Sequence, residues 1–280
     1  MDEVLMDLFA LSLGGGVVAL VLMGVARLTR ARYGAKWRCV IWALLCLRLI
    51  ILVPLVPQVQ APVQMTVPQM DRLVAVSAAP TATPNEGTTS PLRPDEDERE
   101  EAPGLTMSHI VGGVWLLGMC GVLVWSGVSH MRLRRYLRRW AAVETREEVC
   151  CRYAAQAQRL NLKRVPKLLA CPGLDVPMLT GLVAPALMLP QDASPEDGLD
   201  YALLHELIHY RRRDIWLKAL VMLTVSVHWF NPVMWLMVRQ VDRDIELACD
   251  ETALTVLPEE ERLAYGETIL QAAAKVHRQT

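Results

Sequence analysis

The sequence lacks the features that mark several common classes of protein. It contains only two Phe, and its 29 Lys and Arg residues are balanced by 30 Asp and Glu residues, so the formal net charge is -1. Without an excess of positive charge, a nucleic-acid binder that relies on bulk electrostatic attraction is excluded, and we expect no direct contact with nucleic acid. No CxxC pair occurs, so nothing in the sequence indicates a site built from paired thiolates.

Disulfide bonds are also not expected. The seven cysteines are an odd number, and none of them lies between residues 57 and 105. As argued in the following paragraphs, we expect this segment to lie outside the cell. Cysteines confined to membrane and cytoplasmic segments indicate reduced thiols.

What the sequence does contain is long apolar runs. Hydrophobic residues make up 52% of the chain and are concentrated in three segments, at about 4–26, 37–56 and 110–128. A helix needs about 20 apolar residues to cross the hydrocarbon core of a bilayer. We therefore expect three N-terminal transmembrane helices in a membrane domain that covers residues 1–131.

Basic residues predict the orientation of these helices. One cluster lies in the short loop after the first span and another follows the third span, and by the positive-inside rule both are cytoplasmic. The N-terminus and the segment 57–105 then lie outside a cell membrane that the chain crosses several times. This segment holds eight Pro and an acidic run at 95–101, which indicates a disordered external loop.

Residues 132–280 are expected to form a small cytoplasmic α+β domain. Residues 132–162 look helical and strongly charged, whereas 165–170 and 186–189 are short apolar runs bounded by prolines, which is typical of strands. The second of these runs is the candidate edge strand that would align an extended peptide substrate. The fold class is thus a mainly α membrane protein with a small α+β domain.

The pattern HExxH occurs at His205, Glu206 and His209. Ser194 is placed to cap a helix that we expect to continue to about Arg213. Residues four apart share a helix face, so the two imidazoles can bind one ion while Glu206 acts as general base, and zinc is the natural candidate. The alternative is two histidines packed on an amphipathic helix that happen to flank a glutamate.

A third metal ligand must come from elsewhere in the chain, because a catalytic zinc usually has three protein ligands. A helix is expected over 231–256, and on it Glu246 and Asp250 share a face. Glu246 could bind the metal while Asp250 accepts a hydrogen bond from the second nitrogen of a ligand histidine. The alternative is a solvated acidic face. The adjacent Cys249 is either a competing ligand or a buried thiol.

The segment 215–238 limits the topology. Residues 215–229 are apolar except for Lys218, and they lie between the HExxH helix and Glu246. A single membrane crossing there would separate ligands that must meet at one ion, so we expect a buried or membrane-embedded helical hairpin. At its tip, His228 is either a structural histidine or a residue that stabilises the oxyanion of the transition state.

Several motifs together resemble the BlaR/MecR-type membrane metallopeptidases. They are Leu47-Arg48-Leu49, Met178-Leu179-Thr180-Gly181 with 185–190, the HExxH pattern, Arg212-Arg213-Asp214, His228-Trp229-Phe230-Asn231-Pro232 and Glu246-Leu247-Ala248-Cys249-Asp250-Glu251. The resemblance covers most of the chain and implies a gluzincin-like domain on the cytoplasmic side. It implies His205, His209 and Glu246 as zinc ligands and Glu206 as catalytic base.

The sequence departs from this family at its C-terminal end. The best-known members carry a fourth span and an extracellular penicillin-binding sensor domain, whereas this chain stops at Thr280 after an amphipathic helix expected over 258–276. It also has no SxxK motif for acylation by a β-lactam. Sensing of β-lactams is therefore not carried over. The chain is either a fragment or a member whose signal enters by another route.

Two classes of function remain open. The first is a membrane zinc endopeptidase that cuts a cytoplasmic protein, which by resemblance would be a transcriptional repressor or the peptidase itself. The second is a signalling adaptor whose metal domain binds a regulatory partner without cutting it. Proteolytic quality control of membrane proteins would use the same chemistry on another substrate. The expected partners are membrane lipid and a cytoplasmic protein substrate, with a homodimer as a candidate assembly.

Overall fold

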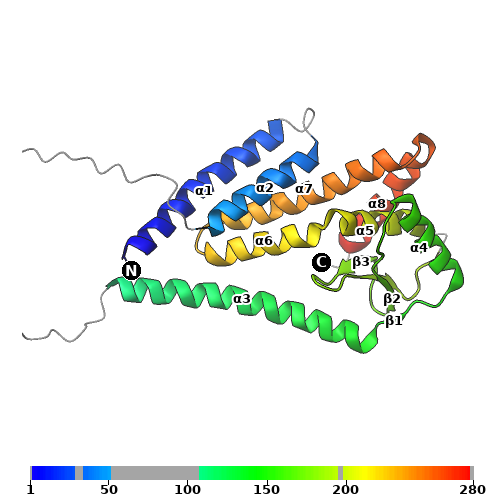
Figure 1. Ribbon diagram of the computed structural model, residues 1–280, viewed down its shortest axis with the longest axis horizontal. Helices are drawn as coiled ribbons and strands as arrows, with labels where there is room; N and C mark the ends of the chain where they lie inside the picture. The colour runs from blue at the N-terminus through cyan, green and yellow to red at the C-terminus, as the bar shows by residue number, and fades with distance from the viewer. Residues whose placement is uncertain (1, 29–33, 52–106, 195–197, 278–280) are drawn as a thin grey trace, which may run out of the picture. The chain divides into compact units, whose positions relative to one another are not determined.

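The structure, a computed structural model, describes residues 2–28, 34–51, 107–194 and 198–277. The predicted external loop 57–105 lies outside the described residues. The described chain is mainly helical with one small sheet (Figure 1). The helices are α1 (Asp2–Leu28), α2 (Ala35–Ile50), α3 (Met107–Trp140), α4 (Glu147–Arg159), α5 (Leu199–Arg212), α6 (Asp214–Val227), α7 (Pro232–Val256), the 3-10 helix η2 (Glu259–Glu261) and α8 (Arg262–His277).

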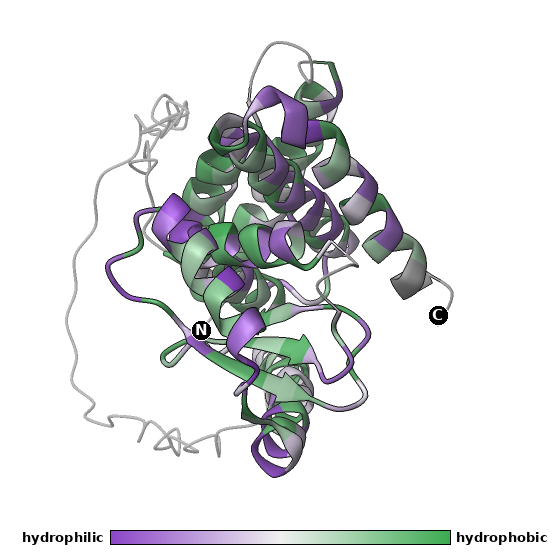
Figure 2. Ribbon diagram, turned by 90° about the vertical axis from the view of Figure 1, so that its right-hand side faces the viewer, coloured by the Kyte–Doolittle hydropathy of each residue, from purple (hydrophilic) through white to green (hydrophobic). Residues whose placement is uncertain are grey.

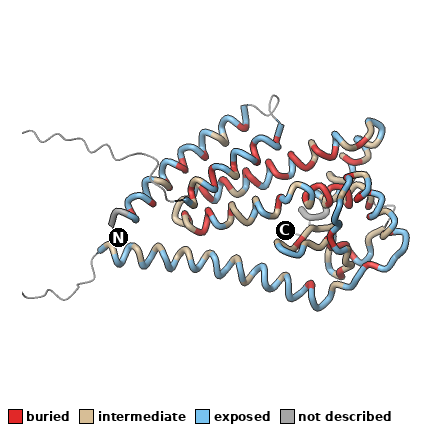
Figure 3. Tube along the Cα trace, viewed as in Figure 1, coloured by how far each residue is buried: buried red, intermediate tan, exposed pale blue. Residues whose placement is uncertain are grey.

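Two of the described helices, α1 and α3, are long and apolar enough to cross a membrane. Helix α3 buries only Leu137 and is drawn mostly in pale blue and tan in Figure 3. Helix α2 ends at Ile50, earlier than the predicted span 37–56, and residues 52–56 of that span lie outside the described part of the chain. Helix α2 is also far more buried, since Trp42 and Leu49 pack among α6 and α7.

The apolar segment 215–238 forms two helices on either side of a short turn. Helix α6 ends at Val227 and α7 begins at Pro232. The side chain of Asn231 accepts a hydrogen bond from the backbone N–H of Val233 at 3.0 Å. Proline at the first helical position has no N–H that would need an acceptor. The two helices pack against each other and against α2. The turn thus brings the later half of α7 back towards α5.

A buried charge joins α2 to α7. Asp244 of α7 is only 1% exposed, and its carboxylate accepts hydrogen bonds from Arg38 Nε and Trp42 Nε1, both at 2.8 Å. The backbone N–H of Ala35, at the start of α2, donates to both carboxylate oxygens of Glu251 at 2.8 Å. Removing one partner of a buried ion pair typically costs about 3–5 kcal/mol. These contacts fix α2 along the length of α7 that carries Glu246.

The sheet has four strands in the order β1-β2-β4-β3. They are β1 (Ala142–Val143), β2 (Lys167–Cys171), β3 (Met178–Thr180) and β4 (Ala186–Pro190). Strands β2 and β4 are parallel and lie where the runs 165–170 and 186–189 were predicted to form strands, so that prediction is confirmed. The sheet is largely green, the hydrophobic colour, in Figure 2. Helices α4, α5 and α7 share a core with β4, in which Leu187 and Leu189 are fully buried.

The prediction that residues 186–189 form an edge strand was wrong. Strand β4 lies between β2 and β3 and is paired on both sides, so β3 is the edge. Strand β3 has only three residues. Its position at the edge follows from the order of pairing, which a run of apolar residues does not encode.

Two predicted helix boundaries also differ from the structure. Residues 132–162 do not form one helix, because α3 ends at Trp140, β1 follows, and α4 begins only at Glu147. Between β1 and α4, the side chain of Glu144 accepts hydrogen bonds from the backbone N–H groups of Thr145 and Arg146. Helix α5 begins at Leu199 after Gly198, whose φ of 73° lies in the left-handed region. Ser194 is therefore not its N-cap, and residues 195–197 lie outside the described chain. All seven cysteines are free thiols, as predicted.

Candidate active site

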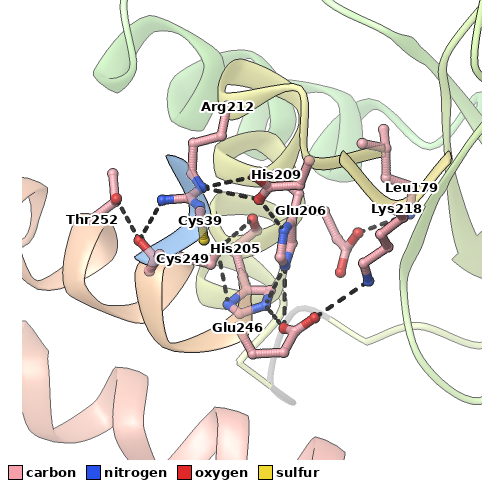
Figure 4. Close-up of polar contacts among 12 residues, drawn as sticks. Cys39, Leu179, His205, Glu206, His209, Arg212, Lys218, Glu246, Cys249 and Thr252 are labelled. Carbon is pink, nitrogen blue, oxygen red and sulfur yellow. Dashed lines mark hydrogen bonds and ion pairs between the residues drawn. The ribbon is translucent and has the colours of Figure 1, made fainter. Parts of the chain in front are cut away.

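Helices α5 and α7 bring three candidate metal ligands together (Figure 4). His205 and His209 lie one turn apart on α5, are about nine-tenths buried, and have their Nε2 atoms 3.0 Å apart. From α7, Glu246 Oε2 lies 3.4 Å from His205 Nε2 and 3.3 Å from His209 Nε2. The structure therefore groups the three residues that the sequence singled out.

These distances fit a tetrahedral metal ion. Ligand atoms bound to zinc at about 2.0–2.2 Å lie roughly 3.3–3.6 Å from one another. The two distances from Glu246 fall at that spacing, and the two imidazole nitrogens need to separate by only a few tenths of an ångström. Two imidazoles and a carboxylate are also a donor set that zinc accepts in catalytic sites.

Cys249 is an alternative third ligand. Its Sγ, together with ligand atoms of His205 and His209, forms a group within 4.8 Å. The thiol lies 3.6 Å from His205 Nδ1 and donates to the backbone carbonyl of the same residue at 3.4 Å. Glu246 instead faces the Nε2 atoms, and the two nitrogens of one imidazole point in different directions. The arrangement therefore favours Glu246 over Cys249.

His209 is held from behind by a carboxylate. Its Nδ1 lies 2.8 Å from Asp214 Oδ2, and Asp214 is 5% exposed at the start of α6. Arg212 Nε donates to both oxygens of Asp214, at 3.1 and 3.0 Å. A carboxylate that accepts a hydrogen bond from Nδ1–H leaves Nε2 as the free nitrogen, which is the atom that faces Glu246.

His205 is held by a tyrosine and a second carboxylate. Its Nδ1 lies 2.8 Å from the hydroxyl of Tyr265 in α8, and this hydroxyl donates to Asp250 Oδ1 at 2.7 Å. Asp250 itself is 3.5 Å from His205 Nδ1. Asp250 thus lies behind a histidine, as expected from the sequence, but its shortest path to the imidazole runs through Tyr265.

Glu206 lies beside this group and faces the edge strand. Its Oε2 accepts a hydrogen bond from the backbone N–H of Leu179 in β3 at 2.8 Å. Burial raises the pKa of Glu206 above its ordinary value, against the opposing effect of the two imidazoles. A carboxylate whose pKa is raised binds a proton more readily, which favours a role as general base.

The ionisable side chains of the site shift one another's pKa values. Burial acts to lower the pKa of His209, but hydrogen bonds with Asp214, Cys249 and Glu246 outweigh it and raise the pKa to about 12. Burial acts to raise the pKa of Glu246, but hydrogen bonds from the two imidazoles outweigh it and hold the pKa well below its usual range. The site therefore favours an ionised carboxylate that faces positive charge, which a divalent cation would also supply.

Two cavities flank Glu206. One of about 320 Å³ lies towards α8 and is lined mainly by apolar residues, among them Val176 and Ile269. The other, of about 260 Å³, lies towards the start of α6 and is lined by Asp214, Lys218 and Leu179 among others. Lys218 Nζ lies 3.6 Å from Glu246 Oε1. An extended chain along β3 would thus meet an apolar side and a polar side of the site.

His228 lies away from this group. It follows the C-terminal end of α6, whereas Asp214 begins the same helix. Fourteen helical residues at 1.5 Å each put the two ends about 20 Å apart. His228 is fully buried, and its Nε2 lies 3.2 Å from the carbonyl oxygen of Leu49 in α2. This position favours the structural interpretation of His228.

Three contacts of the site were not predicted from residue patterns. Tyr265 is separated from His205 by 60 positions and belongs to no local motif. Leu179 contributes a backbone N–H, which no residue type reveals. Asp214 gave a weak signal, because an acidic residue often begins a helix, and α6 does begin there.

Comparison with known proteins places the chain in a family. The family model for the BlaR1 peptidase M56 matches residues 6–280. The chain belongs to this family. The match includes the whole of the candidate active site and the helices before it, so M56 membership supports an activity of the metallopeptidase type.

The curated relatives that match include a regulatory protein and methicillin resistance proteins. The chain is 29% identical over 161 residues to the regulatory protein BlaR1 of Bacillus licheniformis, a match that covers 56% of this chain and 26% of the relative. It is 32% identical over 103 residues to the methicillin resistance mecR1 protein of Staphylococcus aureus (strain Mu50 / ATCC 700699), covering 36% of this chain and 18% of the relative. The mecR1 protein of Staphylococcus epidermidis matches to the same extent. The matches thus span about a quarter or less of these relatives.

Proposed function

We propose that the chain is an integral membrane zinc endopeptidase of the M56 family. His205, His209 and Glu246 would hold one zinc ion, and Glu206 would act as the general base. The observation that carries this proposal is the set of three ligand atoms within 3.4 Å of one another, contributed by two separate helices. A buried carboxylate and the edge of a sheet lie next to them.

The chemistry requires one group that moves a proton. Zinc, when bound, supplies a Lewis acid that polarises the scissile carbonyl and lowers the pKa of water. Glu206 accepts a proton from the attacking water and then passes it to the amine nitrogen as the peptide bond breaks. Asp214 and Tyr265 keep the imidazoles of His209 and His205 in the orientation that leaves Nε2 free.

Strand β3 would align the substrate. The N–H of Leu179 points away from β4 and towards α5, so the outer edge of β3 faces the site. An extended peptide could add to this edge by main-chain hydrogen bonds. Such bonds do not depend on the peptide's side chains, so peptides of different sequence would bind in the same register. Such a peptide would run across Glu206 between the two flanking cavities.

The substrate is proposed to be a cytoplasmic protein in a signalling pathway. The relatives carry the names regulatory protein and methicillin resistance protein, which favours a transcriptional repressor or the peptidase itself as the target. The proposed topology has spans at about 4–26, 37–56 and 110–128 in a cell membrane. It places the N-terminus and residues 57–105 outside and the gluzincin-like domain 132–280 inside, because the arginine clusters flank the cytoplasmic ends.

One observation favours an adaptor that does not cut its partner. The carboxylate of Glu206 is engaged by the N–H of Leu179, so an internal donor competes with the water from which the base must take a proton. In this second candidate function the same surface, from β3 to α8, would bind a regulatory protein without hydrolysis.

A comparison of cells that carry the wild-type protein with cells that carry Glu206→Gln distinguishes the peptidase from the adaptor. For the peptidase, mass spectrometry of new N-termini detects cleavage products that Glu206→Gln lowers by about 10²–10⁴-fold. The purified variant keeps one zinc per chain, whereas Glu246→Ala loses metal. Glu260→Gln is the matched control, because Glu260 is exposed on η2. Equal product levels in wild type and Glu206→Gln would favour the adaptor.

A further inference from the structure

Helix α3 continues from an apolar segment directly into a cluster of arginines. Residues 110–128 carry no charge, and the helix runs unbroken to Trp140. Five arginines follow the apolar segment, all of them exposed: Arg132, Arg134, Arg135, Arg138 and Arg139. None of the five forms a hydrogen bond or ion pair with a described residue. Arg139 lies over the ring of Trp140, 5.6 Å from its centroid, and the charge of the other four is open to an external partner.

Two of these arginines border a cavity. A hollow of about 220 Å³ lies between the end of α3 and the sheet, and its lining includes Arg134, Arg138, Thr180 and Gly181. Arg134 and Arg138 are four residues apart and share one helix face. The hydroxyl of Thr180 has no hydrogen-bond partner among the described residues. No carboxylate lines this cavity, so its polar side chains can all donate to an anion.

If residues 110–128 span the bilayer, the cavity lies just beyond the lipid headgroup layer, with Arg134 on its near side and Arg138 about 15 Å along the helix from Val128. At 1.5 Å per residue, Arg134 lies about 9 Å beyond Val128 along the helix. The interfacial layer on each side of the hydrocarbon core is about 5–8 Å thick. The long side chain of arginine can reach back by several ångströms to meet a phosphate in that layer.

One face of α3 connects the apolar segment to the cavity. Val124, Gly127, Met131, Arg134 and Arg138 follow one another at spacings of three and four, which places them in a single stripe. Val124 is 63% exposed and Met131 is 54% exposed. No atom lies within 4 Å of the position that a Cβ of Gly127 would take. The stripe thus offers open apolar surface that leads up to two unpaired guanidinium groups.

We propose that this cavity binds the phosphodiester headgroup of an anionic membrane phospholipid, whose acyl chain lies along the stripe. The proposal rests on the membrane placement given above but not on the peptidase activity. Two guanidiniums and a hydroxyl would hold the phosphate, and the surplus positive charge of the cluster selects an anionic headgroup over a zwitterionic one. Thr180 directly follows Leu179 in β3, so the bound lipid would brace the strand that faces Glu206.

Native mass spectrometry of the full chain in detergent tests the proposal. The protein is titrated with phosphatidylglycerol and, separately, with phosphatidylcholine. We expect one molecule of phosphatidylglycerol to bind with clearly higher affinity than phosphatidylcholine. The double variant Arg134→Gln with Arg138→Gln is expected to weaken this binding about 30-fold, as for the loss of charge-assisted hydrogen bonds. Thr180→Val should weaken it by a smaller factor.

The matched control is Arg132→Gln with Arg135→Gln, which removes the same charge from residues that do not line the cavity. We expect this pair to change the affinity less than threefold. Equal losses in both pairs would overturn the site in favour of diffuse attraction. Displacement of the lipid by an equal concentration of inorganic phosphate would overturn the assignment to a lipid. Zinc content and cleavage, measured in parallel, report on the peptidase independently.

Discussion

Arg212 connects three elements to one candidate metal ligand. Its Nε donates to Asp214, its Nη1 donates to the carbonyl of Ala248 in α7 at 3.0 Å, and its Nη2 lies 3.6 Å from Cys39 Sγ in α2. Asp214 in turn holds His209. The guanidinium fork is suited to this position, because it offers five donors in a fixed plane. The orientation of His209 therefore depends on contacts that reach α2.

We expect Asp214→Asn to weaken zinc binding by about 10–100-fold, because the carboxylate behind a ligand histidine both orients the ring and raises its basicity. Arg212→Gln should have a smaller effect in the same direction, since Asp214 remains but is held less firmly. Zinc affinity is measured by competition with a chromophoric chelator.

The neighbouring Arg211 provides the control for these variants. It is exposed and has no partner among the described residues, so Arg211→Gln changes the charge as Arg212→Gln does without touching Asp214. Its zinc affinity should equal that of the wild type. If Asp214→Asn also binds zinc as tightly as the wild type, the carboxylate does not support the ligand.

At the scale of elements, α3 and α6 meet at a close contact. The indole N–H of Trp115 donates to the carbonyl of Val227 at 2.9 Å, and the indole N–H of Trp229 donates to the carbonyl of Trp115 at 3.1 Å. Gly118 lies under the Trp229 ring, and a Cβ there would overlap the indole. This glycine is required by close approach and not by its backbone angles.

Gly118→Ala is expected to destabilise the protein by about 1–3 kcal/mol, because an added methyl group in a filled contact forces the ring or the helix to move. Gly113→Ala is the control on the same helix, since its added Cβ meets no atom within 4 Å. That variant should be neutral or slightly stabilising. Thermal unfolding in detergent, followed by tryptophan fluorescence, measures both. Equal melting temperatures for the two variants would contradict the role of Gly118.

At the scale of the whole molecule, the topology that we propose rests on the distribution of charge. An impermeant maleimide applied to intact cells should leave Cys151, which is exposed on α4, unlabelled until the membrane is permeabilised. A Ser90→Cys variant should label in intact cells, because residue 90 lies in the segment that we place outside. Labelling of the wild type in intact cells would reverse the proposed orientation.

Some parts of this molecule could be predicted from its sequence and others could not, for a physical reason. His205, Glu206 and His209 were predictable because one turn of helix sets their relation. Glu246 lies beside the two histidines, and its position was predictable once it was taken as the candidate third ligand, because candidate ligands of one ion must lie close together. Tyr265 was not, since its contact depends on how α8 packs over α5. The identity of β3 as the edge strand depends on pairing order, which is also a property of the assembled fold.

Helix α7 belongs to both main hydrophobic clusters of the described chain. Its first part, including Met237 and Val241, packs with α2 and α6, and its last part, including Cys249 and Ala253, packs with α5 and the sheet. A fragment that began after α3 would expose Met237 and Val241 and leave Asp244 without Arg38. A cleavage assay on such an excised fragment would therefore examine a chain that lacks part of its hydrophobic core, so the test of the proposed activity needs α2 as well as the part that carries the HExxH pattern.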